Sequence, residues 1–411
     1  MIKPKISIIS PVYYKSNPYI QQTYDSLKNQ TIQEWEWLIL LNNGGKISDE
    51  IAKDKRVKIL TEIGKDNNIG RLKKKLSLKA TSEIIVELDA DDMLTPNALQ
   101  EIIQAFKDKK THFAYSNTVE FFNDTWKPRT YDSYWGWKTK PFKYQDKELL
   151  ETIAFPIYAT TIMRIEWAPN HVRAWRKKSY QQIRGHNEEL PSGDDHELMC
   201  KFFLEFGEQG FKWIKKPLYL YRVHDNNHSI VNNDEVQDIV QTNYFNYSRK
   251  IAVKWAQDKK LRLIDMSVDS EDWMDFEKIN INDLKKIKTN SVGVIKAHNI
   301  LEKCTDPIKT MQELWRILDH GGLLFLEVVS SDCKHAFANP LNKSFWNEES
   351  TKFYTQKFFA EKIGFKGKFQ SWRNETFYPT DWHKENDYLI TQVDLCAIKK
   401  QTPILPGPQW Q

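Results

Sequence analysis

Short apolar runs alternate with amphipathic segments along the first quarter of the chain. Uninterrupted apolar runs are typical of buried strands, whereas apolar residues spaced three and four apart are typical of helices. Strands are therefore predicted at 5–10, 35–41, 57–62 and 83–90, and helices at 19–29, 68–80 and from Thr95, which caps a helix with Pro96 in its first turn. This alternation indicates an α/β fold with a parallel, doubly wound sheet.

The pattern changes twice further along the chain. Residues 127–193 are aromatic and irregular, which predicts long loops and short strands, and they are followed by a helix at 195–206 and a strand at 211–224. A second α/β pattern then begins, with strands at 261–268 and 292–301, a helix from 307 that ends at Gly321-Gly322, and another strand. We therefore predict domains at 1–245 and 246–400, with the proline-rich residues 401–411 as an extended tail.

Composition supports two folded domains and narrows the range of partners. The chain has 411 residues, of which 40% are hydrophobic and 28% charged, and its net charge is only +5. So small an excess of basic residues does not indicate nucleic acid binding. The four cysteines show no paired spacing, which argues against a zinc site or a disulfide framework and favours the cytoplasm. No apolar stretch is long enough for a transmembrane segment, so only peripheral membrane contact is expected.

The strongest chemical signal is the segment VELDADD at 86–92, where an apolar strand ends in acids. Ligands of open parallel sheets bind beyond the carboxyl ends of the strands, so Asp89 and Asp91 are expected in the binding crevice. One carboxylate can bind a divalent cation, Mn²⁺ or Mg²⁺, and the other a sugar hydroxyl. Such a cation stabilises the charge of a departing diphosphate. The alternative is that Asp91 and Asp92 only begin a surface turn.

Three segments in the same order resemble the family 2 glycosyltransferases, which have the GT-A fold. They are ISIISPVYY, SLKNQTIQEWEWLILLNNG and NIGRLKKKLSLKATSEIIVELDADDMLTP. The resemblance implies that a nucleotide-sugar binds between these segments. The residues that match its binding positions are Pro11, Tyr13, Asn42, Asn43, Asp89 and Ala90, with Asp91 as a metal ligand. Lys74 is the expected phosphate or base contact in the run Lys73 to Lys75.

Two later segments extend the resemblance to about residue 230. SGDDHELMCKFFLEFG is similar to the family's acidic pair, whose second member is the catalytic base, which implies this role for Asp195 with Asp194 beside it. YLYRVHDNNHS is similar to the segment whose histidine joins the metal or the diphosphate, which implies His224, with Arg222 also gripping the diphosphate. The alternatives are that Asp195 caps a helix and that His224 is a partly buried strand histidine.

Chemistry supports the role of Asp195, because a sugar hydroxyl is a poor nucleophile unless a carboxylate accepts its proton. With one such base and no second nucleophilic carboxylate evident, we expect direct displacement with inversion at the anomeric carbon. Family members often carry aspartates where this chain has Asn42 and Asn43, and an asparagine carbonyl can still accept a hydrogen bond from uracil. The expected donor is therefore a UDP-sugar, and the acceptor a glycan, a lipid or a protein.

Aromatic residues of the irregular segment could form a stacking platform for an acceptor sugar, although core packing is the more common use of such rings. The candidates are Trp135, Trp137, Trp167 and His171.

The second half resembles the class I methyltransferases that use S-adenosylmethionine. The similar segments are HNILEKCTDPIKTMQELWRILDHGGLLFLEV and NKSFWNEESTKFYTQKFFAEKIGF. The glycine-rich turn that lets the backbone approach this cofactor is missing near LRLIDMSV, although Asp265 could hold a ribose. We therefore expect a degenerate domain that does not bind S-adenosylmethionine and serves in docking, oligomerisation or as a lid.

Three functions follow from these signals. The first is an inverting, metal-dependent glycosyltransferase. The second is a methyltransferase that acts on a sugar or polysaccharide. The third is a non-catalytic carbohydrate-binding scaffold, because a fold alone does not establish activity.

Overall fold

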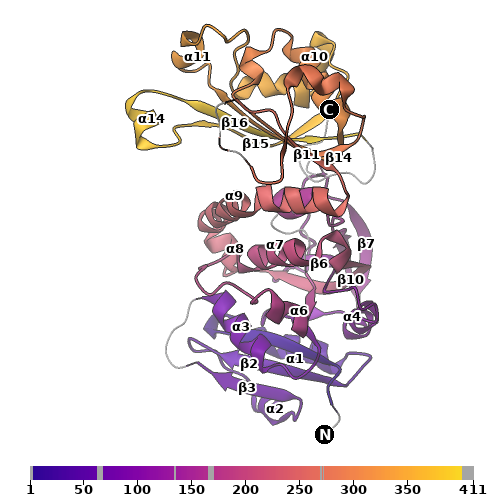
Figure 1. The fold of residues 1–411 in the computed structure, drawn as a ribbon. Coiled ribbons are helices and arrows are strands. Elements are labelled where there is room, and N and C mark those ends of the chain that lie inside the picture. Colours follow the sequence, from indigo (N-terminus) through magenta and orange to yellow (C-terminus); the bar gives the residue numbers. More distant parts are fainter. Residues whose placement is uncertain are drawn as a thin grey trace. The chain divides into compact units, whose positions relative to one another are not determined.

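The computed structural model describes residues 3–62, 68–133, 136–164, 171–268, 271 and 273–399. The chain forms two compact units, the first mainly of residues up to Ser248 and the second mainly from Arg249 onward. The division falls within one long helix, α9 (Asn233–Asp258), close to the boundary expected at 245 (Figure 1). In the part of the chain that the structure describes, no helix combines the length and apolarity needed to cross a bilayer.

The first unit begins with four parallel strands, in the spatial order β3-β2-β1-β4. These strands and the helices between them are β1 (Ile6–Val12), α1 (Ile20–Lys28), β2 (Trp35–Leu41), α2 (Asp49–Lys53), β3 (Val57–Thr61), α3 (Ile69–Lys79) and β4 (Ile84–Glu87). All four predicted strands and both complete helices lie where the apolar pattern indicated. The α/β fold and the parallel pairing of this half of the sheet are confirmed.

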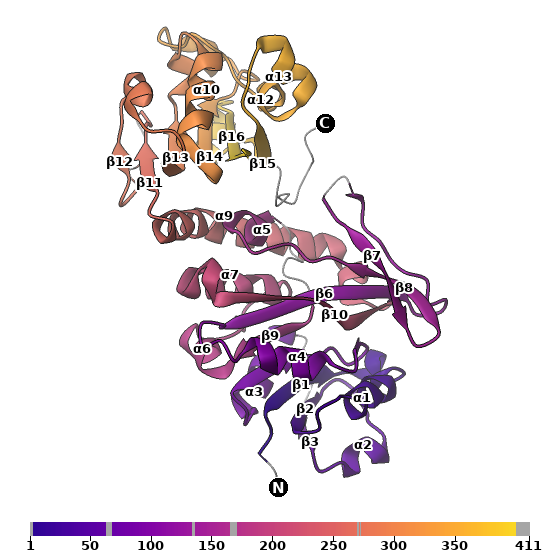
Figure 2. The ribbon, with the colours of Figure 1, turned by 90° about the vertical axis from the view of Figure 1, so that its right-hand side faces the viewer.

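The sheet continues beyond β4 with mixed strand directions. Strand β9 (Arg173–Arg176) runs antiparallel to both β4 and β6 (Phe113–Phe122), and β10 (Phe211–Val223) pairs in parallel with β6. The short β5 (Met93–Leu94) and the hairpin of β7 (Thr139–Tyr144) and β8 (Lys147–Thr152) complete the ten-stranded sheet (Figure 2). The expectation of an entirely parallel sheet was therefore too simple, because β9 returns to the sheet from the irregular segment.

The remaining helices of this unit are mostly short. They are α4 (Ala98–Ala105), α5 (Ala159–Arg164), α6 (Lys177–Gln182), α7 (Asp194–Phe206) and α8 (His228–Val231). The predicted start of α4 at Thr95 is wrong, because this helix begins at Ala98 with Asn97 as its N-cap residue. The Thr95 hydroxyl instead donates to the Pro217 carbonyl at 3.1 Å and so ties the loop to β10.

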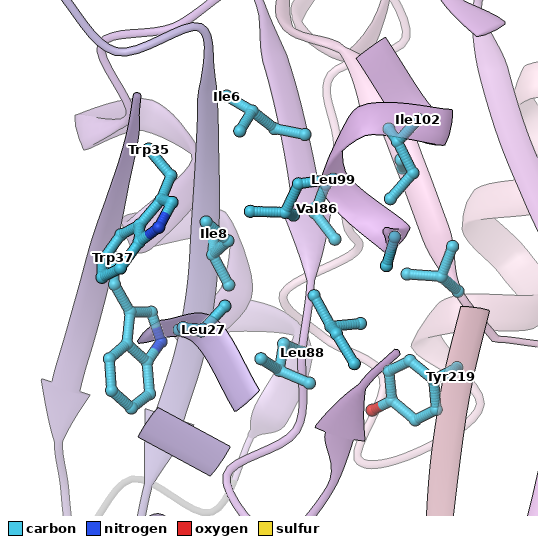
Figure 3. Packing of buried hydrophobic residues seen from close by; sticks show 14 of the residues in the cluster. Ile6, Ile8, Leu27, Trp35, Trp37, Val86, Leu88, Leu99, Ile102 and Tyr219 are labelled. Carbon is cyan, nitrogen blue, oxygen red and sulfur yellow. The ribbon is translucent and has the colours of Figure 1, made fainter. Parts of the chain in front are cut away.

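A single apolar core covers one face of the parallel strands. Ile6 and Ile8 of β1 alternate with residues of the other face, as do Trp35 and Trp37 of β2, so these four side chains point the same way (Figure 3). Helices α1 and α4 contribute further members of this cluster, Leu27, Leu99 and Ile102. The Trp37 indole N–H donates to the Ser10 hydroxyl at 2.8 Å, which satisfies its polar group within the core.

The second unit is a smaller α/β sheet in the order β12-β11-β13-β14-β16-β15. Its first four strands are parallel, and β16 runs antiparallel to both β14 and β15. The strands are β11 (Arg262–Asp265), β12 (Glu277–Lys278), β13 (Val292–His298), β14 (Leu318–Val329), β15 (Phe369–Phe377) and β16 (Ile390–Ala397). Its helices are α10 (Pro307–Ile317), α11 (His335–Ala338), α12 (Lys352–Thr355), α13 (Lys357–Ile363) and α14 (Asp381–Glu385).

The glycine pair of this unit does not end a helix as predicted. Helix α10 ends at Ile317, and Gly321 and Gly322 lie within β14, where the register with β13 shifts. Gly321 has a positive φ of 82°, and a Cβ at Gly322 would stand 3.1 Å from the Gly293 carbonyl oxygen. The glycines therefore permit an irregular, close approach between two strands. The predicted tail at 401–411 lies outside the described residues.

The core predicts a clear difference between two leucines. Leu99 is completely buried in the main cluster, whereas Leu78 on α3 is 53% exposed. We expect Leu99→Ala to lower the free energy of unfolding by about 2–5 kcal/mol, because it removes buried methyl groups and leaves a cavity. Leu78→Ala, the matched control, should change it by less than about 0.5 kcal/mol. Urea unfolding followed by tryptophan fluorescence measures both values, and equal stabilities would contradict this account of the core.

Candidate active site

The carboxyl ends of three neighbouring parallel strands carry most of the predicted binding residues. Strand β1 lies between β2 and β4, so the residues that follow these strands meet at one edge of the sheet. Tyr13 follows β1, Asn42 and Asn43 follow β2, and Asp89 follows β4, while Pro11 lies within β1 itself. Backbone hydrogen bonds from Asn42 N–H to Val12 O (2.8 Å) and from Tyr14 N–H to Asn43 O (3.3 Å) join the first two turns.

The two asparagines have different surroundings. Asn42 is buried, whereas Asn43 is partly exposed and has a positive φ of 44°. Asparagine adopts this left-handed conformation more readily than most residues, so the backbone gives one physical reason for its presence at 43. The turn also lies close to β1, because a Cβ at Gly45 would stand 2.1 Å from the Val12 carbonyl oxygen.

The loop from Asp89 to Asp92 is held by its backbone. The carbonyl of Ala90 accepts a hydrogen bond from the Thr23 hydroxyl at 3.0 Å, and the Asp89 N–H donates to the Tyr219 hydroxyl at 3.1 Å. These two contacts hold the main chain of the loop. The carboxylates of Asp89 and Asp91 are partly accessible, and the Asp91 side chain is 15% exposed. Tyr13 lies near both acids: burial, followed by their negative charges, raises the pKa of its hydroxyl to about 12.

Asp91 and His224 lie side by side, as the sequence suggested. His224 Nε2 is 3.1 Å from Asp91 Oδ2, and the imidazole stacks on the Tyr19 ring with centroids 4.8 Å apart. His224 Nδ1 accepts a hydrogen bond from the Asn226 N–H at 3.2 Å. In the neutral ring the proton therefore lies on Nε2, which donates it to Asp91.

Asp92 fits the alternative of a structural turn. It is buried, and its Oδ1 accepts a hydrogen bond from the Arg222 N–H at 2.7 Å. Burial, together with the charges of Asp91 and Asp89, raises the pKa of Asp92 well above its usual range. Of the three aspartates in the motif, only Asp89 and Asp91 are therefore partly accessible.

The guanidinium of Arg222 is used differently from the expectation that it grips a diphosphate beside His224. Arg222 is only 1% exposed, and its Nε donates to the Asp91 carbonyl at 2.7 Å. Its two terminal nitrogens donate to Asn123 Oδ1 (2.9 Å) and Gln22 Oε1 (2.7 Å). Arg222 thus holds the backbone of the loop 89–92 by a partly buried hydrogen bond. Arg222 belongs to β10, whereas His224 lies just beyond the end of this strand at Val223.

A second pair of acids begins α7. Asp195 is the more accessible, with a side chain 20% exposed, and its Oδ2 lies 2.7 Å from a terminal nitrogen of Arg173. Burial alone would raise the pKa of Asp195, but the positive charges of Arg173 and Lys73 outweigh this effect and hold the pKa well below its usual range. Asp195 is therefore ionised at neutral pH, and the same positive charges make it a weaker base than a free carboxylate.

Asp194 lies deeper, with its side chain only 5% exposed. Its Oδ2 is 3.5 Å from Lys73 Nζ and 3.6 Å from His186 Nε2. Burial raises the pKa of Asp194 to about 6, although the charge of Lys73 opposes the shift. The alternative that Asp195 merely caps the helix does not match this geometry, because Asp195 is within α7 and Gly193 is the N-cap residue.

Two neighbouring lysines of α3 pair with different acids. Lys74, the predicted phosphate or base contact, pairs with Glu188 at 2.7 Å. Lys73 instead turns inward and lies 2.7 Å from Glu87 Oε1. Lys73, Glu87 and Arg173 are the residues of this cluster that sequence reasoning missed. The signal for Lys73 was present, because Leu72 and Leu76 are buried on the same face of α3.

Glu87, Asp89 and His171 form a further cluster whose possible ligand atoms all lie within 4.8 Å of one another. Glu87 already faces two cations, Lys73 at 2.7 Å and Arg173 at 3.3 Å, which disfavour an additional dication. Burial, with the charges of Glu87 and Asp91, raises the pKa of Asp89 to about 7 despite the opposing charge of Lys73. Asp91 and His224 are therefore the better placed pair for a metal ion.

The candidates for a sugar-stacking platform fall into two groups. His171 is buried and stacks on Tyr219 at 4.5 Å, and Trp137 packs against Phe155 at 4.5 Å. Both rings thus serve in packing. Trp135 and Trp167 lie outside the described residues.

In the second unit, Asp265, the acid expected to hold a ribose, is paired with lysines of the protein. Asp265 Oδ2 lies 2.9 Å from Lys278 Nζ and 3.7 Å from the fully buried Lys296 Nζ. Its Oδ1 accepts the Ser267 N–H at 2.8 Å. The end of β11 thus presents an internal ion-pair cluster where a cofactor site would need an available carboxylate.

Comparison with protein families gives two separate matches along the chain. Residues 7–171 match the model described as Glycosyl transferase family 2, and residues 229–326 match the model described as Methyltransferase domain. A putative glycosyltransferase, EpsH of Bacillus subtilis (strain 168), is 26% identical over 234 residues, which are 54% of this chain and 62% of EpsH. Chondroitin synthase of Pasteurella multocida (strain Pm70) is 25% identical over 239 residues, 56% of this chain and 22% of that protein. The chain thus spans less than two thirds of either relative.

Two solved structures are similar to this chain at lower sequence identity. TarS of S. aureus (residues 1–349, with UDP) has 16% identity and a TM-score of 0.42, covering 61% of this chain and 65% of that one. The mannosyltransferase PcManGT of Pyrobaculum calidifontis, in complex with GDP-Man and Mn²⁺, has 14% identity and a TM-score of 0.39, covering 62% and 65%.

The family matches agree with the parallel strands of the first unit and with the aspartates that follow β4. Residues 7–171 match a family 2 glycosyltransferase domain, which this chain joins to a region that matches a methyltransferase domain.

Proposed function

We propose that the first unit is an inverting, metal-dependent glycosyltransferase that moves a sugar from a UDP-sugar to a hydroxyl group of an acceptor. The observation that carries this proposal is that the first unit contains two acidic sites of different character. Asp91 with His224 suits a cation, and Asp195 suits a base. The two sites are linked through Glu87, which lies beside Asp89 and shares Arg173 with Asp195.

Asp91 and His224 are the residues that would hold the cation. Their donor set, one carboxylate oxygen and one imidazole nitrogen, is compatible with Mn²⁺ and less suited to Mg²⁺, which prefers oxygen ligands. To bind a cation through Nε2, the neutral His224 ring must carry its proton on Nδ1, which gives up the hydrogen bonds of the imidazole with Asp91 and with the Asn226 N–H. A cation at this position would neutralise charge on the departing diphosphate.

Asp195 would act as the catalytic base. Its ionised carboxylate accepts the proton of the acceptor hydroxyl while the oxygen bonds to the anomeric carbon and the bond to the diphosphate breaks. Asp194 is buried against Lys73 and is not placed to act as a second nucleophile. A single displacement inverts the configuration at the anomeric carbon.

The donor and acceptor follow from the remaining residues and the relatives. Pro11, Tyr13, Asn42 and Asn43 lie at the ends of β1 and β2, where the nucleotide would bind. Two relatives bear the names chondroitin synthase and hyaluronan synthase, and both products are polysaccharides. We therefore favour a glycan over a lipid or a protein as the acceptor.

A methyltransferase function is the second candidate, because residues 229–326 match that domain. The residues at the end of β11 do not fit S-adenosylmethionine. Asp265 is held by Lys278 and Lys296, and Met266, Ser267 and Val268 follow it in place of a glycine-rich turn. We therefore assign no methyl transfer to the second unit.

Removal of the metal should abolish donor binding and turnover together. EDTA should suppress Mn²⁺-dependent UDP binding in titration calorimetry, and added Mn²⁺ should restore it. Asp91→Asn should weaken this binding at least about tenfold, because it removes the charged ligand. Asp108→Asn, at an exposed acid of another loop, is the matched control. Equal UDP affinity with and without Mn²⁺ would contradict the metal assignment.

Loss of the base should affect turnover without affecting donor binding. Asp195→Asn keeps the size of the side chain but cannot accept a proton, so we expect kcat to fall by about 10²–10⁴-fold. The affinity for UDP and Mn²⁺ should remain within about twofold of the unaltered protein. The release of UDP from UDP-glucose, UDP-galactose and UDP-N-acetylglucosamine measures turnover. Unchanged kcat in the variant would rule out Asp195 as the base.

S-adenosylmethionine should not bind the second unit. Titration calorimetry of the full chain with this cofactor should give no heat above dilution, because the carboxylate of Asp265 is already paired. UDP with Mn²⁺ serves as the positive control on the same sample. Saturable binding of S-adenosylmethionine would revive the methyltransferase candidate.

A further inference from the structure

A buried pair of opposite charges connects the strand of the acidic motif to the proposed base. Glu87 of β4 and Arg173 of β9 are direct cross-strand partners in the antiparallel pairing of these strands. Glu87 is completely buried and Arg173 is 5% exposed. Arg173 Nη1 lies 3.3 Å from Glu87 Oε1. Residues at such paired positions extend to the same face of the sheet, so the strand register itself brings the two charges together.

The same guanidinium reaches the proposed base. Its second terminal nitrogen, Nη2, lies 2.7 Å from Asp195 Oδ2. Because a guanidinium is planar and rigid, fixing one nitrogen against Glu87 also fixes the direction in which the other can donate. Asp195 Oδ1 accepts the N–H of His196 at 2.7 Å, so both oxygens of this carboxylate have a defined position.

Glu87 is held from its other side as well. Lys73 Nζ of α3 lies 2.7 Å from Glu87 Oε1 and 3.5 Å from Asp194 Oδ2. Three elements, α3, β4 and β9, therefore meet at one buried carboxylate. A buried ion pair contributes little net stability, because desolvation of the charges offsets most of their attraction. The main effect expected of such a network is to fix the positions of its charged groups.

We propose that Arg173 and Glu87 are positioning residues, with Glu87 orienting the Arg173 guanidinium and Arg173 holding the Asp195 carboxylate toward the acceptor hydroxyl. This inference rests on the proposed function, because it takes Asp195 to be the base. Neither residue is assigned a contact with the sugar or the nucleotide. Their effect would therefore appear in the rate of the chemical step and not in donor affinity.

Two substitutions test the chain of contacts. Arg173→Lys keeps the positive charge but replaces the planar fork with a single ammonium, and Glu87→Gln keeps the shape of the side chain but removes its charge. Each should lower kcat for Mn²⁺-dependent UDP release from the best of the three UDP-sugars by about 10- to 100-fold, because small displacements of a catalytic group are costly. KM for the UDP-sugar, and the affinity for UDP with Mn²⁺, should remain within about twofold.

The matched control is Arg176→Lys on the same strand. Arg176 donates to the backbone carbonyls of Phe106, Asp108 and Thr111, away from the acidic groups. This variant loses comparable hydrogen bonds, so it reports what a merely structural loss on β9 does. Its kcat should remain within about twofold of the unaltered protein.

Each result separates the possibilities. A folded Arg173→Lys protein with unaltered kcat would overturn the positioning role, and if that variant does not fold, an unaltered kcat in Glu87→Gln would overturn it. A loss of Mn²⁺ or UDP affinity as large as the loss of kcat would also overturn it, and would favour Glu87, Asp89 and His171 as a metal site. An inactive Asp195→Asn beside a fully active Arg173→Lys would refute this inference alone, whereas a fully active Asp195→Asn would refute the proposed function as well.

Discussion

The candidate site depends on the compensation of buried carboxylates by buried cations. Glu87 and Asp194 are nearly inaccessible, and an isolated carboxylate in such surroundings would be strongly unfavourable. Lys73 bridges these two acids, and Arg173 bridges Glu87 to Asp195. Several carboxylates can therefore be concentrated at one edge of the sheet without unfolding it.

This compensation links elements that are distant in the sequence. The acidic motif follows β4, Asp194 and Asp195 begin α7, and the cations come from α3 and β9. A second set of contacts, from Tyr219 and Arg222 of β10, fixes the backbone of the acidic loop from beneath. The loop therefore presents Asp89 and Asp91 outward while Asp92 turns into the protein. Preorganised groups of this kind need little rearrangement when a ligand binds.

The second unit matches a methyltransferase domain over part of its length, but its acid at the end of β11 is paired within the protein. Its parallel strands end in a cluster where Lys278 and Lys296 neutralise Asp265. The family match extends over part of this unit, yet the residues at the strand end serve the protein's own ion pairs. Fold similarity alone therefore does not assign methyl transfer, and function must be argued from the site.

The sequence by itself determined the order of strands and helices and the location of the acidic motifs. Apolar periodicity is a local property, so the first four strands, α1, α3 and α7 could be predicted from it, and the motif order indicated the family. It did not determine the return of β9 into the sheet or the start of α4 at Ala98, because both depend on contacts with other strands. The sequence also singled out Asp91, His224, Asp194 and Asp195 as candidate residues, but not the side chains that contact them. Only the tertiary structure decided that Lys73 and not Lys74 faces the acids, that Arg222 lies beneath the loop, and that Glu87 joins Arg173. The physical reason is that charge pairing inside a protein is set by three-dimensional proximity and burial, which residue spacing along the chain does not encode.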